Sequence, residues 1–288
     1  MFLFQILKQH ALTLFLFTKS DIKTTLIPIT ILALCAAPVH HPSYIPETMF
    51  WIWLHLLQFD VSNQTLDPEE DALNKRDRPV PSGRITLRDA VILRWTLVPI
   101  CWALSAAYSL QVFYSSVALS VLTGIYNELH AHAGHWLVRN MVNAAGFASF
   151  EFGSTLVARY DRSHLDKAGY LSVLFSAGIF FTTIQAQDFK DTEGDLAIGR
   201  QTLPIVFPSF SRKTVLPGMM GWSFLLTYMW QVDVWTGSVF IGLAQITGLR
   251  FLVFNSRASD QVSFYVYNVW LTMAHALPGY WRYYHKAM

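Results

Sequence analysis

Nine apolar segments, each near the length of a bilayer crossing, constrain the fold of this chain more than any other feature. A transmembrane helix needs about 20 predominantly apolar residues. Hydropathy places these segments near 22–40, 48–66, 88–109, 111–127, 137–158, 167–187, 212–231, 234–254 and 263–281. Only 14% of the residues are charged, against about 25% in an average soluble domain. We therefore expect an all-α, polytopic membrane protein with a single transmembrane domain over residues 1–288.

The remaining composition excludes several other classes. Residues 1–20 are apolar with little charge and lack a clear cleavage site, which predicts a helix lying on the membrane surface. The net charge of +2 and the absence of a basic run give no support for a nucleic-acid partner. Cys35 and Cys101 fall inside expected spans, so a disulfide framework is not expected. No feature predicts an obligatory protein partner.

Two acidic segments interrupt the apolar background. The first, residues 63–83, is NQTLDPEEDALNKRDRPVPSG and carries Asn63, Asp67 and Asp71 at intervals of four. The second, residues 188–204, is DFKDTEGDLAIGRQTLP and carries Asp188, Asp191 and Asp195. On a helix these spacings place each set on one face. Pro68 favours a break in the first helix, because proline is poorly tolerated inside one.

Each acidic segment follows an apolar helix and is followed by basic residues and proline, as in a divergent internal repeat. This pattern predicts a pseudo-twofold bundle with a central cavity between its halves. The loops on the side of the two acidic segments hold eleven Lys and Arg residues, against three on the other side. Because cytoplasmic loops are enriched in Lys and Arg, we expect a cavity open to the cytoplasm in an integral protein of the endoplasmic reticulum. The sequon at Asn63 would then remain unglycosylated.

Carboxylates at the ends of apolar helices are costly unless cations lie between them. Mg²⁺ binds carboxylate oxygens and bridges to the phosphates of a substrate. The expected Mg²⁺ ligands are Asn63, Asp67, Asp71, Asp188, Asp191 and Asp195, and the expected catalytic set is Asp67, Asp71, Asp191 and Asp195. Contacts to the phosphate oxygens are expected from Arg78, Lys190, Arg200 and Lys23, since charge-assisted hydrogen bonds are strong. The alternative is that these acidic residues are solvated loop and cap residues.

The pattern NxxxDxxxD followed by RPxPSGR, and then DxxDxEGDxxxGRxTLP, resembles the two motifs of the UbiA superfamily of intramembrane prenyltransferases. The resemblance covers roughly residues 18–285. It implies Mg²⁺-dependent ionisation of an isoprenyl diphosphate inside the membrane. Tyr126 matches a tyrosine in a loop that helps close the family's site over substrate, and it is expected to contact the diphosphate. The lysine that follows this tyrosine in many members is absent here.

Two reactions fit this resemblance. Residues 138–153 and 186–195 look most like the fungal terpene cyclases of the superfamily, which favours cyclisation of farnesyl or geranylgeranyl diphosphate. The alternative is transfer of the isoprenyl group to an aromatic, quinone-precursor or lipid acceptor. In either case aromatic side chains would shield a carbocation from water. Candidates for this wall are Trp53, Phe59, Phe147, Phe150, Phe152, Phe180, Phe181 and Trp270.

Two weaker alternatives remain. A transporter would also contain repeats and intramembrane charges, but its carboxylates would lie in mid-helix and not at helix ends. His130, His132 and His135 lie close together in the sequence, yet no fourth zinc ligand is evident beside them.

Overall fold

The computed structural model describes residues 2–66, 68, 71 and 75–285. Within these ranges the regular structure is helical, and the one bridge between extended residues joins His135 to Gln201. The long helices are α1 Phe2–Thr18, α2 Ile27–Ala36, α3 Tyr44–Gln64, α5 Leu87–Tyr108, α6 Leu110–Asn127, α7 Trp136–Val157, α8 Lys167–Thr183, α11 Pro208–Met229, α12 Val234–Val253 and α13 Arg257–Tyr284. The shorter elements are the π-helical turn η1 Ile22–Leu26, the 3-10 turns η2 Ile184–Gln187 and η3 Phe189–Asp191, and the helices α9 Thr192–Ala197 and α10 Leu203–Val206.

The all-α prediction is confirmed, and in the described part of the chain each of the nine expected spans coincides with a helix between α2 and α13. The ends differ by a few residues for local reasons. Helix α2 ends at Ala36 and not near residue 40, because Ala37 precedes Pro38 and takes the extended conformation that a following proline favours. Helix α8 ends at Thr183 and continues as two 3-10 turns.

Hydropathy and burial divide the helices into two kinds. Three segments are apolar enough by length and composition alone to cross a membrane, namely Leu87–Tyr108, Lys167–Ala197 and Val234–Val253. Other helices carry polar side chains that point into the bundle. Helix α3, for example, buries His55, Gln58 and Asp60. Buried polar side chains inside a membrane bundle are costly and mark its functional interior.

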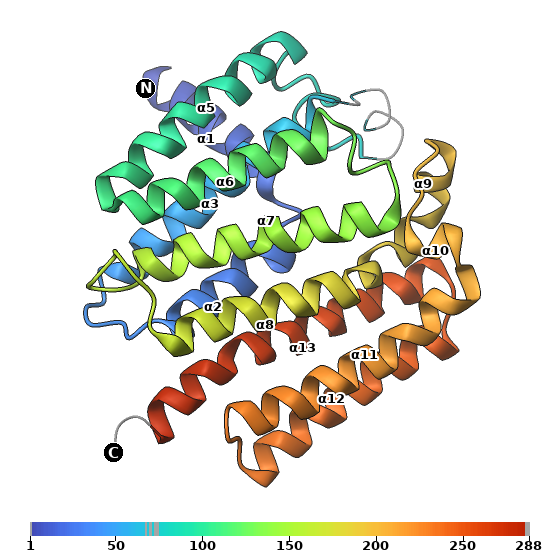
Figure 1. Ribbon diagram of the computed structural model, residues 1–288. Helices are drawn as coiled ribbons and strands as arrows, with labels where there is room; N and C mark the ends of the chain where they lie inside the picture. Colours follow the sequence, from blue (N-terminus) through green and yellow to red (C-terminus); the bar gives the residue numbers. More distant parts are fainter. Residues whose placement is uncertain (1, 67, 69–70, 72–74, 286–288) are drawn as a thin grey trace.

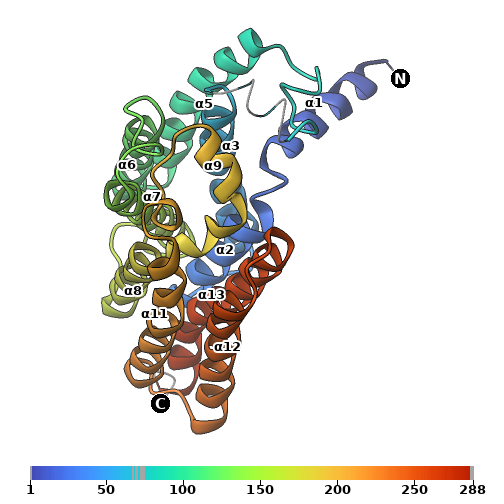
Figure 2. The same cartoon turned by 90° about the vertical axis from the view of Figure 1, so that its right-hand side faces the viewer.

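The long helices form two groups with α2 between them (Figure 1). Helices α3, α5, α6 and α7 form one group, and α8, α11, α12 and α13 form the other. Helix α2 packs against both α7 and α13, so the first and last spans meet. Figure 2 looks onto the end of the bundle that carries α9, which lies between the two groups. This end is where the acidic segments meet.

Each group is held by a buried tryptophan that donates to a serine on a neighbouring helix. The Trp51 indole on α3 donates to Ser105 Oγ on α5, and the Trp270 indole on α13 donates to Ser223 Oγ on α11, both at 2.9 Å. Interhelical hydrogen bonds of this kind stabilise membrane bundles. The hydrophobic effect does not drive the helices together there, because the surrounding lipid is also apolar. Trp270, an expected cavity residue, is therefore a packing residue.

Candidate active site

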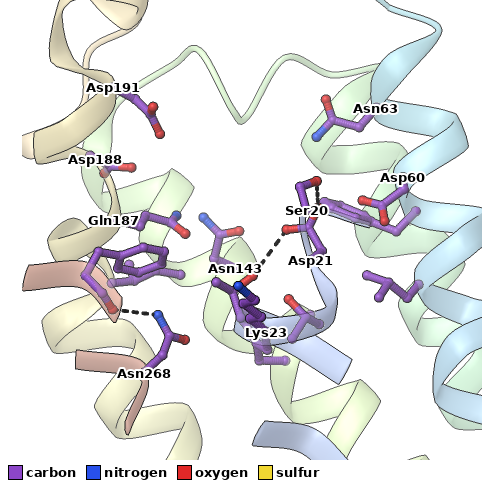
Figure 3. A pocket seen from close by; sticks show the side chains of 18 of the residues that line it. Ser20, Asp21, Lys23, Asp60, Asn63, Asn143, Gln187, Asp188, Asp191 and Asn268 are labelled. Atoms are coloured by element: carbon purple, nitrogen blue, oxygen red, sulfur yellow. Dashed lines mark hydrogen bonds between the residues drawn. The ribbon is translucent and has the colours of Figure 1, made fainter. Parts of the chain in front are cut away.

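Both acidic segments line one cavity of about 630 Å³ (Figure 3). This volume lies within the range of small-molecule sites. The C-terminal end of α3 forms one wall, and the turns from η2 to α9 form the facing wall. Residues of α1, η1, α6, α7, α8 and α13 also contribute to the lining. The two segments therefore share one face of the bundle.

The first acidic segment leaves helical structure earlier than its spacing predicts. Helix α3 ends at Gln64, so Asn63 in its last turn and Asp71 do not share one continuous helix. Asn63 lines the cavity (Figure 3). Asp71 is buried and is not among the described residues of the lining, but Arg78, which does line it, donates to both Asp71 carboxylate oxygens at 2.8 Å. Asp67 lies outside the described residues.

The second acidic segment brings all three of its aspartates to the cavity, although not from a single helix face. Asp188 lies between the 3-10 turns, Asp191 precedes α9, and Asp195 lies within α9. The three-residue pitch of a 3-10 turn keeps Asp188 and Asp191 on the same side of the chain. Figure 3 labels Asp188 and Asp191, which lie on the wall that faces Asn63.

Each described aspartate of the proposed metal-binding set has a basic partner. Arg139 on α7 donates two hydrogen bonds of 2.8 Å to Asp188, and Arg200 donates to Asp195 at 2.9 Å. Lys190 pairs with Asp191. These pairs balance the charge of the carboxylates beside an apolar chamber, and they leave arginine and lysine side chains at the cavity wall. The sequence leaves Arg139 either a polar contact of the site or a helix–helix hydrogen bond, and no spacing pattern indicates its partner 49 residues away.

The other expected contact residues also reach the cavity. Lys23 lies in the π-helical turn η1, and Tyr126 lies in the last turn of α6. The Tyr126 ring lies 6.0 Å from that of Phe59 and 5.7 Å from that of His132. His132 Nδ1 pairs with the Tyr126 carbonyl at 2.8 Å. The loop between α6 and α7 thereby fixes the position of Tyr126.

The deeper part of the cavity is aromatic. Phe147 and Phe180 stack face to face at 3.8 Å between ring centroids, and Phe150 lines the cavity beside them. The expected wall residues that line the cavity are Phe59, Phe147, Phe150 and Phe180. Trp53, Phe152, Phe181 and Trp270 are not in the described lining, whereas Phe264, Tyr265 and Tyr267 of α13 are and had not been identified. Aromatic faces of this kind stabilise a cation and exclude water.

The donor set at the mouth fits Mg²⁺ in chemical type. Asn63, Asp188, Asp191 and Asp195 offer the amide and carboxylate oxygens that Mg²⁺ prefers. Among the described residues, no three His, Cys, Asp or Glu side chains are grouped closely enough to hold a metal ion. In enzymes that act on phosphates, Mg²⁺ is usually bound through one or two carboxylates together with the substrate phosphates. The histidines between α6 and α7 likewise form no metal cluster within the described chain.

Comparison with known proteins identifies the family. Residues 25–272 match the model of the UbiA prenyltransferase family. The chain belongs to this family. It is 31% identical over 268 residues to fumagillin beta-trans-bergamotene synthase of Aspergillus fumigatus, covering 92% of this chain and 91% of that protein. It is 28% identical over 290 residues to somaliensene A/B synthase of Streptomyces somaliensis, covering 92% and 91%.

The fold comparison agrees with this assignment. A UbiA homologue from Archaeoglobus fulgidus, solved with GPP and Mg²⁺, superposes with a TM-score of 0.65 at 15% identity, over 92% of this chain and 98% of that one. The similarity shows a shared fold. UbiA proteins are integral membrane proteins, so the nine helices and the cavity belong to a membrane-embedded bundle.

Proposed function

We propose that this protein is a Mg²⁺-dependent, membrane-embedded terpene cyclase that ionises an isoprenyl diphosphate and releases a cyclic product. The relatives named as terpene synthases match nearly the whole chain. The observation that carries the proposal is a single cavity with phosphate-binding chemistry at its mouth and an aromatic chamber beneath. Farnesyl and geranylgeranyl diphosphates are the substrates proposed.

The residues of the mouth would hold the diphosphate. Mg²⁺, when bound there, neutralises charge on the leaving diphosphate. Asn63, Asp188, Asp191 and Asp195 are the proposed ligands at the described cavity wall, and Asp67 and Asp71 complete the proposed set. Arg78, Lys190 and Arg200 would donate to phosphate oxygens, since charged donors bind them strongly. Lys23 and Tyr126 are proposed to contact the same group from η1 and α6.

The aromatic chamber would then direct the reaction. The allylic carbon–oxygen bond breaks with both electrons on the diphosphate, which leaves a carbocation on the chain. Phe147, Phe150 and Phe180 present the ring faces that stabilise such a charge. A chamber that excludes water favours attack by the chain's own double bonds over capture by water. This is the step that separates a cyclase from a hydrolase.

Orientation and membrane contacts are proposed on the same basis. The end of the bundle that holds the cavity also holds the loops rich in Lys and Arg, which supports a cytoplasmic orientation of the site by the positive-inside rule. We place the protein in the endoplasmic reticulum. Helix α1 exposes Phe4, Leu7 and Phe15, as expected of a helix lying on lipid. Membrane lipid is thus the proposed surrounding partner, with no nucleic acid and no obligatory protein partner.

The test supplies substrate without an acceptor. Membranes containing the protein are incubated with farnesyl or geranylgeranyl diphosphate and Mg²⁺, diphosphate release is measured, and the extract is analysed by GC-MS. A cyclic terpene that disappears with EDTA, and with Asp191→Ala or Asp67→Ala, supports the proposal. Full activity in either variant would contradict the ligand assignment. Product that forms only after an aromatic, quinone-precursor or lipid acceptor is added would instead support the prenyltransferase function after which the family is named.

A further inference from the structure

Asp60 is a carboxyl group that neither motif includes. It lies on α3 one turn before Asn63, its side chain lines the cavity, and the residue is only 4% exposed. Its Oδ2 atom is buried without a hydrogen-bond partner. Unlike the aspartates of the motifs, it forms no ion pair with any described residue. A buried carboxyl group facing a cavity inside a membrane protein indicates function more than stability.

Asp21 stands beside Asp60 at the same wall (Figure 3). Asp21 is half-buried and lies just before η1, where it accepts hydrogen bonds from Ser20 Oγ at 2.7 Å and Thr24 Oγ1 at 3.4 Å. The π-helical turn that follows it is a rare element, found mostly at functional sites. Asp60 and Asp21 thus form a pair with one buried member and one half-buried member.

A second unpartnered polar atom belongs to another residue of the same lining. Asn143 on α7 lines the cavity, and its Nδ2 atom is buried without a hydrogen-bond partner. In Figure 3 Asn143 lies between the wall of Asp60 and that of Gln187. Buried polar groups are normally satisfied, so Asp60 and Asn143 place two unsatisfied polar side chains at this level of the cavity wall.

The level of Asp60 lies between the diphosphate-binding residues and the aromatic chamber. Asn63 is one helical turn nearer the mouth, and Leu56, which also lines the cavity, is one turn deeper. A substrate with its diphosphate at Asn63 and Asp191 therefore passes its first isoprene units beside Asp60. Of the described carboxylates in the lining, only Asp60 and Asp21 lie on this wall below the motif residues.

We propose that the Asp60–Asp21 pair is the base that ends the reaction by removing a proton from the carbocation. This rests on the proposed function. The two neighbouring carboxyl groups share one proton and carry one negative charge, because both cannot be ionised in contact with each other. The proton leaves a carbon next to the cationic centre and binds this pair, and the two electrons of the broken C–H bond form the C=C bond of a neutral olefin. Both carboxyl groups are then neutral, and Asp21 releases a proton to water in the cavity. The released diphosphate keeps the electron pair of the C–O bond throughout.

The experiment separates ionisation from proton removal. Wild type and Asp60→Asn, in membranes with Mg²⁺ and farnesyl or geranylgeranyl diphosphate in water enriched in ¹⁸O, are compared for diphosphate release and for products by GC-MS. In Asp60→Asn we expect olefin formation to fall about 100-fold, the usual contribution of a general base, and diphosphate release to fall less than about tenfold. The missing olefin should be replaced by alcohols carrying ¹⁸O. Asp21→Asn should shift the products in the same direction to a smaller extent.

Asp77→Asn is the matched control, because Asp77 is an exposed acid at the same mouth, with its Oδ2 atom 3.8 Å from Lys19 Nζ. The products of this variant should match those of wild type. An unchanged olefin yield in Asp60→Asn would overturn the proposal and assign the proton to the diphosphate. Loss of diphosphate release in an Asp60→Asn protein that still melts at the wild-type temperature would overturn it too, since Asp60 would then act in ionisation. If wild type itself releases no diphosphate, the proposed function fails, which is a separate result.

Discussion

Arg139 and Asp188 form the most buried charge pair of the site, with side chains 7% and 3% exposed and two hydrogen bonds of 2.8 Å. The pair ties the 3-10 turns after α8 to α7. These turns have weaker backbone hydrogen bonds than an α-helix, so a side-chain contact is needed to fix the position of Asp188. The position of Asp188 at the cavity wall and the stability of the bundle therefore depend on the same two residues.

Removing the arginine should destabilise the protein strongly. Arg139→Met leaves the Asp188 carboxylate buried without its partner, and breaking such a pair costs about 3–5 kcal/mol. Adding Asp188→Asn should recover much of this loss, because the uncompensated charge is removed. Unfolding in detergent, measured for both single variants and the double variant, gives the coupling energy. Additive losses would show that the two residues do not act as a pair. Arg257→Met, at an exposed position, is the control and should change stability by less than about 0.5 kcal/mol.

Replacing Arg78 should lower activity even when the new residue is lysine. Its Nη1 contacts both oxygens of Asp71, which leaves the other guanidinium donors for phosphate, whereas lysine has a single compact ammonium group. Loss of one hydrogen bond to a charged group costs about 1.5–3 kcal/mol, so kcat/KM in Arg78→Lys should fall about tenfold or more. Steady-state diphosphate release measures this. Arg88→Lys, an exposed residue in the first turn of α5, should retain the wild-type value.

Asp166 lies at the opposite end of the bundle from the cavity. We expect its ionisation to make the stability of the protein depend on pH. Burial alone would raise the pKa of Asp166, but hydrogen bonds from Arg282 and the Gly169 amide outweigh it and hold the pKa well below its usual value. The stabilisation is therefore fully present above the unfolded pKa of about 4 and is lost as the pH falls through the folded pKa.

At pH 7 Asp166→Asn should cost about 1.5–3 kcal/mol, as for loss of hydrogen bonds to a charged group, and the difference from wild type should shrink below about pH 4. Melting temperatures measured across this range test the prediction. A difference that stays constant down to pH 2 would exclude an ionised Asp166 as its cause. Diphosphate release at pH 7 should remain normal, because the 17 residues of α8 separate Asp166 from the cavity.

The sequence predicts the helices well because a bilayer imposes length and composition on each span. It predicts the cavity mouth because the motif aspartates recur at regular spacing. It does not predict the end of α3 at Gln64 or the partner of Asp188, since both depend on tertiary contacts. Nor does it separate Trp270, a packing residue, from Phe264, a cavity residue six positions away on α13. Asp60 cannot be identified from the sequence, because a single carboxylate in an apolar helix has no spacing pattern.

Helix packing in the second group should depend on glycine at position 248. A Cβ added to Gly248 of α12 would lie 2.6 Å from the Cα atom of Leu216 on α11. Because the obstacle is backbone, a rotamer change cannot relieve it, and the two helices must separate. Gly248→Ala should therefore destabilise the protein by about 1–3 kcal/mol, the usual cost of overpacking. Small residues allow such close approach between membrane helices.

Gly242→Ala on the same helix is the matched control, because a Cβ there would meet nothing within 4 Å. That variant should be neutral or up to about 1 kcal/mol more stable, as alanine is the better helix former. Detergent unfolding of both variants gives the comparison. Equal effects of the two substitutions would show that α11 and α12 adjust freely. The Leu216→Ala background should not rescue Gly248→Ala, since the Leu216 Cα atom remains, whereas rescue would mean that the side chain alone sets the helix separation.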